Sequence, residues 1–351
     1  MKKFLKVGVA LFSSLLIASS GFAGNKDRAG QAGGSILLVN PWARSTGWAG
    51  ANTASATGLE AMSLNVAGTA FTKKTEVMFA NTQWLGASGG DAITINAFGF
   101  TQKVGETGVL GFGVTSMNFG QIAVTTVDKP EGGSGFFSPN YMNLGISYAK
   151  EFSNSIYGGI AVKVVSEKIA NVGATGVCFD AGVRYVTGEN DKIKFGIALR
   201  NVGPTMQYRG DGMSIRAFLP GTEADLTLEQ RTTQFELPSM VNIGGSYDFR
   251  LAEDHRLTAA ANFTSNSFTK DQYLLGLEYG FRNFFMLRGG YAHEEGLRDI
   301  ATRTTAFTGP TAGVTIEVPL NDNGSTFGID YSYRSTNPFN GVHTIGARIT
   351  L

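Results

Sequence analysis

Tyr273-Leu-Leu-Gly-Leu-Glu-Tyr-Gly-Phe281 is the stretch that decides the fold class of this chain. Its odd positions hold Tyr, Leu, Leu, Tyr and Phe, whereas its even positions hold Leu, Gly, Glu and Gly. Because side chains alternate between the two faces of a β-strand, these two sets face opposite ways. An apolar, aromatic-ended face backed by glycine and isolated charge is typical of a barrel wall with lipid outside and a polar lumen inside.

The same alternation recurs from Thr75 to Leu351 and is interrupted by turns of two kinds. Six turns are short and polar, and seven other connections are mostly longer, with the longest running from Tyr208 to Thr233. Outer-membrane barrels have short periplasmic turns and long outer loops. The pattern therefore predicts an all-β fold, a 14-stranded antiparallel transmembrane barrel. The expected strands are residues 75–84, 91–102, 107–126, 136–150, 156–166, 176–187, 192–207, 234–250, 256–264, 271–280, 283–293, 305–319, 325–334 and 342–351.

The phase of the alternation also assigns the charged residues of the strands to a face. Inward positions hold charges of both signs: Lys163, Asp180, Arg184, Lys194, Arg200, Glu278, Arg288, Asp330, Arg334 and Arg348. We expect ion pairs that brace the lumen, because buried charges need partners, and a solute path is the alternative interpretation. The single cysteine, Cys178, shares the inward phase and is expected to be a small filler rather than a reactive thiol.

The amino terminus has the pattern of a secretory signal peptide. A basic region at residues 1–6 precedes an apolar run at residues 7–18 and the small-residue end Gly21-Phe-Ala23. The run is shorter than the roughly 20 residues that a membrane-spanning helix needs. We therefore expect residues 1–23 to be cleaved off and the rest to reside in a bacterial outer membrane.

Residues 24–74 do not alternate and precede the predicted barrel of residues 75–351. They are rich in Ala, Gly, Ser and Thr and contain Trp42 and Trp48, and residues 59–64 could form a helical turn or two. A barrel of this size lies between those filled by side chains and those with an open channel. About 50 residues too polar for lipid therefore predict a plug inside the lumen.

Composition and motif spacing argue against several other functions. The formal net charge is +1 and no basic stretch could contact phosphates, so we expect no nucleic-acid partner. His255, His293 and His343 are scattered, and no Ser/His/Asp arrangement or metal-ligand spacing is evident. Gly111-Phe-Gly113 lacks the third glycine of a dinucleotide fingerprint. We therefore expect no enzyme activity, no cofactor and no metal.

Several motifs occur in the order that a known family shows. They are Arg44-Ser-Thr-Gly-Trp-Ala-Gly-Ala-Asn52, Leu64-Asn-Val-Ala-Gly68, Glu76-Val-Met-Phe79 with Trp84-Leu85, Phe179-Asp-Ala-Gly182, Arg200-Asn-Val-Gly-Pro204 with Met206, and Phe235-Glu-Leu-Pro238. The chain resembles PorV/PorQ proteins, which belong to the larger FadL-like group, over about residues 35–351. Val66 replaces the proline of the family's usual Asn-Pro-Ala-Gly, which puts the tight turn of the plug in doubt.

The resemblance implies a barrel component of the type IX secretion system of Bacteroidota. Such a protein binds the C-terminal signal domain of exported cargo, receives the cargo from the large translocon barrel and passes it to a surface attachment complex. In this chain the loop from Tyr208 to Thr233 would read the cargo, through its apolar residues Met213, Ile215, Phe218 and Leu219. The alternative is that these residues fold over the mouth as a lid.

A FadL-like transporter of hydrophobic small molecules is the second functional hypothesis. In that group the plug moves and a lateral opening in the wall passes the ligand. Trp42, Trp48 and Asn65 would then lie near the path. A nonspecific porin agrees less well with the sequence, because a plug would block a water-filled channel.

Overall fold

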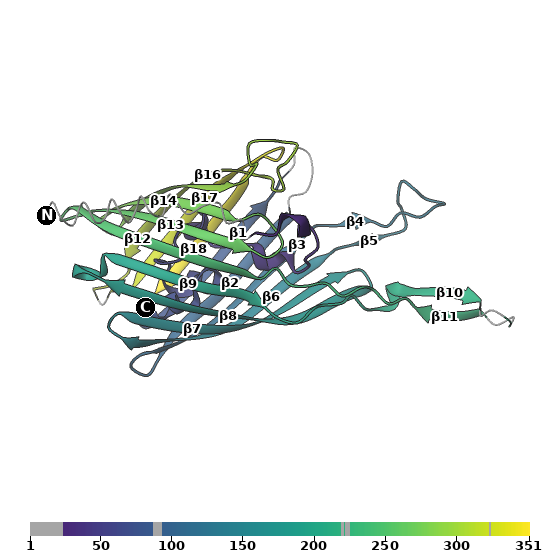
Figure 1. The fold of residues 1–351 in the computed structure, drawn as a ribbon, viewed down its shortest axis with the longest axis horizontal. Coiled ribbons are helices and arrows are strands. Elements are labelled where there is room, and N and C mark those ends of the chain that lie inside the picture. The colour runs from purple at the N-terminus through teal and green to yellow at the C-terminus, as the bar shows by residue number, and fades with distance from the viewer. Residues whose placement is uncertain (1–23, 87–92, 219–220, 222–224, 323) are drawn as a thin grey trace.

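The computed structural model describes residues 24–86, 93–218, 221, 225–322 and 324–351, so the predicted signal peptide lies outside the described residues. Fourteen strands form a closed antiparallel barrel, which confirms the predicted fold (Figure 1). They are β1 (Thr75–Trp84), β2 (Ile93–Val104), β3 (Gly108–Asn118), β6 (Asn140–Ser153), β7 (Ile156–Ile169), β8 (Val172–Thr187), β9 (Ile193–Val202), β12 (Met240–Ala252), β13 (His255–Asn266), β14 (Gln272–Phe281), β15 (Phe285–Glu294), β16 (Phe307–Pro319), β17 (Thr326–Thr336) and β18 (Val342–Thr350). The barrel closes where β1 pairs with β18, from Glu76 opposite Thr350 to Gln83 opposite His343.

The two faces of the wall are those that the alternation predicts. In β14, Tyr273, Leu275 and Leu277 are 55–60% exposed, whereas Leu274 and Glu278 are buried. Such an apolar outer face is what a barrel presents to lipid, and the inner face is polar. The fold is therefore that of a transmembrane barrel of the outer-membrane type.

The described residues contain no helix that is long and apolar enough to cross a membrane.

Two connections project from the barrel end opposite the carboxyl terminus (Figure 1). The β3–β6 connection carries the short ribbon of β4 (Ile122–Ala123) and β5 (Phe136–Phe137). The longer β9–β12 connection, residues 203–239, carries η6 (Asp211–Met213) and the ribbon of β10 (Ser214–Phe218) and β11 (Asp225–Glu229). At the other end of the barrel, η5 (Glu189–Asp191) lies in the β8–β9 turn.

Several predicted strand boundaries are wrong, including the start of β12, which lies at Met240 rather than at residue 234. Strand β3 ends at Asn118 rather than at residue 126, and β9 ends at Val202 rather than at residue 207. The sequence Gly203-Pro204 follows β9, and a proline has no N–H to donate to a sheet. The predicted loop at residues 167–175 is instead a tight turn at residues 170–171, because Ala170 adopts a left-handed conformation, with φ 49°.

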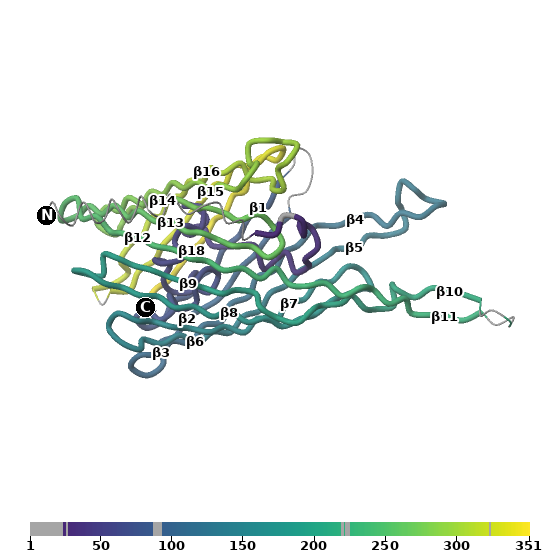
Figure 2. The backbone as a smooth tube through the Cα atoms, viewed as in Figure 1, coloured from purple at the N-terminus to yellow at the C-terminus, as the bar shows by residue number. Residues whose placement is uncertain are grey.

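The N-terminal segment, residues 24–74, lies largely inside the barrel, as the purple tube in Figure 2 shows. It consists of short helices: η1 (Lys26–Arg28), η2 (Ser35–Leu38), α2 (Ala43–Thr46), η3 (Gly58–Ser63) and η4 (Val66–Phe71). Ala51, Ala54, Ala61 and Ala67 have no exposed surface. Hydrogen bonds tie the segment to the wall, since Thr46 Oγ1 lies 2.7 Å from Ser332 Oγ. The segment therefore occupies lumen that the barrel would otherwise leave open.

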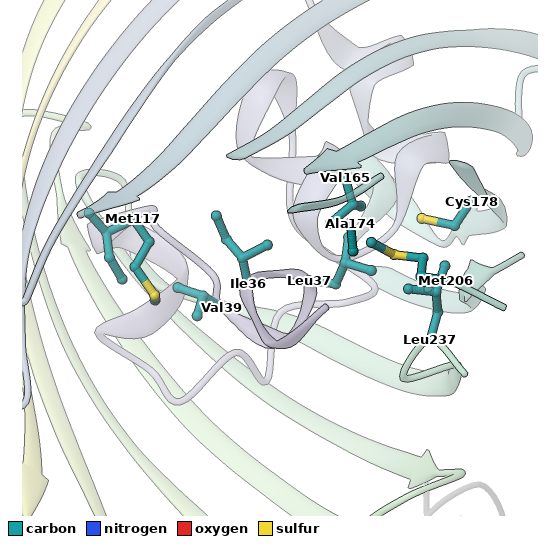
Figure 3. Packing of buried hydrophobic residues seen from close by; sticks show 10 residues of the cluster. Ile36, Leu37, Val39, Met117, Val165, Ala174, Cys178, Met206 and Leu237 are labelled. Atoms are coloured by element: carbon teal, nitrogen blue, oxygen red, sulfur yellow. The ribbon is translucent and has the colours of Figure 1, made fainter. Parts of the chain in front are cut away.

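An apolar cluster joins the N-terminal segment to the outer half of the wall (Figure 3). Ile36 and Leu37 of η2 pack with Val165, Cys178 and Met206, all of them almost fully buried. Cys178 is unpaired and fills space inside the wall. Burial of these side chains anchors η2 through the hydrophobic effect, at about 1.5–3 kcal/mol for each large aliphatic side chain.

Candidate functional site

A cavity of about 380 Å³ lies in the outer half of the lumen. The outer ends of β1, β9 and β12–β17 form its wall, and Thr46, Ala49, Gly50 and Leu64 of the N-terminal segment form its floor. Because the floor and the wall come from opposite ends of the chain, the cavity exists only when the segment is inside the barrel.

Part of the cavity lining is apolar and aromatic. Met240, Leu274, Trp84 and Phe307 line it. The rings of Trp84 and Phe307 meet edge to face, with their centroids 5.5 Å apart. These surfaces can bury the apolar body of a small molecule.

A row of amides and hydroxyls on β12 and β13 lies between Met240 and Leu274. Asn262 Nδ2 donates to Thr264 Oγ1, and Thr264 Oγ1 donates to Asn242 Oδ1, both at 2.9 Å. Asn262, Thr264 and Asn266 are alternate residues of β13, so the inward phase of the strand brings them to one face. Gln272 donates to Glu294 Oε2 at 3.1 Å beside this row.

Two arginines, Arg200 and Arg334, also line the cavity. Arg334 lies over the ring of Phe307, with its Cζ 3.7 Å from the ring centroid. Within the part of the chain that the structure describes, Arg334 forms no ion pair, and its Nε is buried without a hydrogen-bond partner. The Nε of Arg200 and the Oδ1 of Asn262 also lack hydrogen-bond partners. Arg200, Arg334 and Asn262 thus line the cavity, and each has one buried polar atom without a hydrogen-bond partner among the described residues.

The other predicted luminal charges mostly pair with each other or with neighbouring strands. Lys163 Nζ lies 2.7 Å from Asp180 Oδ2, and Glu278 bridges Arg288 at 2.6 Å and Arg256 at 2.7 Å. Lys194 pairs with Asp248, Arg348 with Glu317, and Asp330 accepts a hydrogen bond from Thr315. Arg184 instead donates to the carbonyl oxygen of Ala56 at 2.8 Å. These contacts connect strands that are adjacent or one strand apart, or join the wall to the N-terminal segment.

The predicted plug residues contact the wall and do not line the large cavity. Trp42 and Trp48 are 4% and 5% exposed, and Trp42 Nε1 donates to Ser63 Oγ at 3.2 Å. Asn65 begins η4 by accepting a hydrogen bond from Ala67 N, and it donates to the carbonyl oxygen of Val183 at 3.0 Å. These three residues therefore hold the N-terminal segment in place.

Of the predicted loop residues, Ile215 and Phe218 lie on the projecting β10–β11 ribbon. Ile215 is 49% exposed and Phe218 is 75% exposed, whereas Met213 is partly buried in η6. Leu219 lies outside the described residues. The ribbon points away from the barrel rather than across its mouth (Figure 1), so these residues do not form a lid.

The base of this long connection is fixed to the barrel by Tyr208. Its hydroxyl donates to Glu167 Oε2 at 2.5 Å. Burial, together with the Glu167 carboxylate, raises the pKa of Tyr208, so the phenol stays a neutral donor. Sequence analysis did not single out this pair or the cavity wall, although the inward phase of residues 262, 264 and 266 was a usable signal.

The described residues include no group of three or more His, Cys, Asp and Glu side chains that could hold a metal ion. His255 instead lies 2.6 Å from the Tyr279 hydroxyl, and His343 Nδ1 lies 2.8 Å from the Tyr331 hydroxyl.

A scan against models of protein families finds no match, and a search of curated proteins finds none either. Solved structures do match. A TodX mutant named as a monoaromatic hydrocarbon channel has a TM-score of 0.56 and 14% identity, over 88% of this chain and 97% of that one. The P. putida toluene transporter TodX has a TM-score of 0.52 and 12% identity, over 87% and 95%. A Pseudomonas aeruginosa FadL homologue has a TM-score of 0.51 and 12% identity, over 88% of this chain and 98% of that one.

The chain has the FadL-like barrel fold. At these identities the likeness shows the fold alone. The first two structures are named as a channel and a transporter of small hydrocarbons, and none of the three is named as an enzyme or a secretion component.

Proposed function

We propose that this barrel passes small hydrophobic molecules, some with a polar end, across the outer membrane. The observation that carries the proposal is the luminal cavity. Its volume of about 380 Å³ is within the range of roughly 300–1,000 Å³ that small-molecule sites show. A folded protein domain is far too large for it.

The lining supports a ligand with two unlike ends. Leu274, Met240 and the Trp84–Phe307 pair would contact an apolar body. The guanidinium of Arg334 would meet a polar or anionic end, because it has no ion pair among the described residues and planar guanidinium groups suit carboxylates. The fold-level likeness to hydrocarbon channels agrees with this chemistry.

The N-terminal segment would act as the plug of this channel. Thr46, Ala49, Gly50 and Leu64 form the cavity floor, so a ligand bound there has no direct route onward to the periplasm. Passage would therefore require the segment to shift or the wall to open beside it.

Direct binding and cellular uptake test the proposal. The purified barrel should bind radiolabelled toluene at equilibrium, and cells that carry it should accumulate toluene faster than cells that lack it. Saturable binding that is lost in a variant whose larger side chain fills the cavity supports the proposal. Absence of saturable binding of both toluene and benzoate would contradict it.

One observation favours a second function, the binding of cargo signal domains in type IX secretion. In the β10–β11 ribbon, Ile215 pairs with Leu228 and Ala217 pairs with Leu226, which gives the ribbon one apolar face. Ile215, Leu226 and Leu228 are 40–49% exposed. An apolar face on a projecting ribbon is suited to a protein partner. The partners would be cargo signal domains, the large translocon barrel and surface attachment subunits.

Gentle purification from native outer membranes tests this second function. Recovery of a translocon barrel and cargo signal domains with the wild-type chain, and their loss from an Ile215→Asp variant, would support it. Thr227→Asp, on the opposite face of the ribbon, is the matched control. If neither partner is recovered with the wild-type chain, the secretion role is wrong.

A further inference from the structure

Gly24 is bound at the outer mouth of the barrel. Its backbone nitrogen donates to Asp271 Oδ2 at 2.8 Å. Asp271 lies in the outer connection between β13 and β14, and its Oδ1 accepts from Asn266 N at 3.3 Å. One carboxylate therefore holds both the start of the N-terminal segment and the end of a barrel strand.

The fold leaves no room for a side chain at Gly24. A Cβ built there would lie 2.6 Å from the backbone nitrogen of Asp271 and 2.9 Å from the carbonyl oxygen of Thr269. A signal-peptide cleavage motif requires small residues before the cleaved bond, such as Gly21 and Ala23. The motif places no such requirement on the residue after the bond. The glycine at position 24 is thus explained by the contact with Asp271.

Three further contacts hold residues 24–33 across the mouth. Arg28 forms an ion pair with Glu236 at 2.6 Å and lies over the ring of Phe268, 4.1 Å from its centroid. The nitrogen of Gly33 donates to the carbonyl oxygen of Glu236 at 3.1 Å. The start of the segment therefore ties the β9–β12 connection to the β13–β14 connection, beside the cavity.

We propose that cleavage of the Ala23–Gly24 bond completes this attachment as an ion pair between the new amino terminus and Asp271. Water adds its hydroxyl group to the carbonyl carbon of Ala23, and the nitrogen of Gly24 leaves as an amine that takes up protons. At neutral pH the product is a carboxylate on Ala23 and an ammonium on Gly24, because α-amino groups have pKa values of about 7.7–8.0. A neutral N–H that donates to Asp271 thereby becomes a cationic donor. The contact gains Coulomb attraction, because its donor and its acceptor then carry opposite charges.

The attachment has a consequence for the cavity. Before processing, the contact is a hydrogen bond from a neutral amide to a carboxylate, and afterwards it is an ion pair that is partly shielded from solvent. Processing therefore fixes residues 24–38, which include the cavity-lining Ser35 and Leu38, in their place at the outer mouth. This inference does not depend on the identity of the transported molecule.

Mass spectrometry of the barrel purified from outer membranes is the first test, and the expected amino terminus is Gly24. The second test uses trypsin on the folded barrel in detergent, with cleavage after Arg28 as the readout. Asp271→Asn removes the carboxylate. Insertion of Ala-Gln between Ala23 and Gly24 moves the ammonium away but keeps a neutral N–H at Gly24.

Both variants should be cleaved after Arg28 about 3- to 10-fold faster than the wild-type barrel, as expected when one charge-assisted contact is lost from a locally opening segment. The combination of both changes should add little to either one. Asp254→Asn, at the periplasmic end, is the matched control, and heat-modifiable mobility on gels confirms that each variant is folded. A mature amino terminus other than Gly24, or equal cleavage rates for the insertion variant and wild type, would overturn the proposal.

Discussion

Leu274 and Leu275 are consecutive residues of β14 that face opposite sides of the barrel wall. Leu274 is 8% exposed and lines the luminal cavity, whereas Leu275 is 60% exposed on the lipid-facing surface. The alternation of side chains along a strand separates two identical residues into two different environments. The pair therefore allows the cavity to be tested against the wall that surrounds it.

Leu274→Trp should abolish saturable toluene binding, because the larger ring would project into the cavity of about 380 Å³. Leu275→Trp adds the same ring on the lipid side and should leave binding unchanged, since aromatic residues are common on the outside of such barrels. Equilibrium binding to the two purified variants makes the comparison. Equal binding by both would show that this cavity is not the ligand site.

Arg334→Ala should weaken benzoate binding about 10-fold or more and leave toluene binding nearly unchanged. A hydrogen bond to a charged group is worth about 1.5–3 kcal/mol, and only benzoate has a carboxylate for Arg334 to bind. Competition between the two ligands for each variant measures the difference. Arg282→Ala, in an exposed periplasmic turn, is the control. If Arg334→Ala weakens the binding of toluene and benzoate equally, Arg334 acts only by covering the ring of Phe307.

Asp180→Ala should destabilise the barrel by about 3–5 kcal/mol, because it leaves Lys163 buried without a counter-ion. Asp180 also accepts a hydrogen bond from Asn201 N at 2.7 Å, which fixes the end of β9. Denaturant unfolding in micelles provides the measurement. The double variant with Lys163→Met should recover part of the loss.

The control for this prediction is Asp254→Asn, which breaks an exposed pair with Arg282. An exposed ion pair contributes no more than about 1 kcal/mol. If Asp180→Ala costs no more than Asp254→Asn, the luminal ion pairs do not stabilise the wall.

Gly290→Ala should displace the N-terminal segment and raise single-channel conductance. A Cβ at Gly290 would lie 2.4 Å from the carbonyl carbon of Trp48, whereas a Cβ at the neighbouring Gly289 meets no atom within 4 Å. Overpacking of this kind typically destabilises the folded state by about 1–3 kcal/mol. Here it would destabilise the contact between the N-terminal segment and the wall. Conductance in planar bilayers should rise for Gly290→Ala and stay at the wild-type value for Gly289→Ala. The same low conductance for both variants would argue against a plug role.

The strand pattern was predictable from the sequence because the alternation is local. The alternation of side chains along β14 alone assigns Tyr273, Leu275 and Leu277 to the lipid-facing side, whatever position β14 takes in the barrel. Strand ends were less predictable, because they depend on partners. Pairing of β9 with β12 ends at Arg200 opposite Met240, about 40 positions apart, and β9 ends at Val202 opposite Phe179 of β8.

The cavity could not be predicted, because its surfaces come from distant parts of the chain. Trp84, Arg334 and Leu64 meet only after the barrel closes around the N-terminal segment. The alternation assigns Arg334 to the inner face but does not reveal that it has no ion pair among the described residues, whereas Asp180 and Glu278 have theirs.

The sequence by itself determined a closed transmembrane barrel, its strand number and the inner and outer faces of its wall, because alternation and turns act between neighbouring residues. Only the tertiary structure decided which charges pair, where the N-terminal segment lies and where a cavity remains. Those outcomes depend on the volume left inside the closed barrel and on contacts such as Gly24 with Asp271, 247 residues apart. No local pattern encodes such distances.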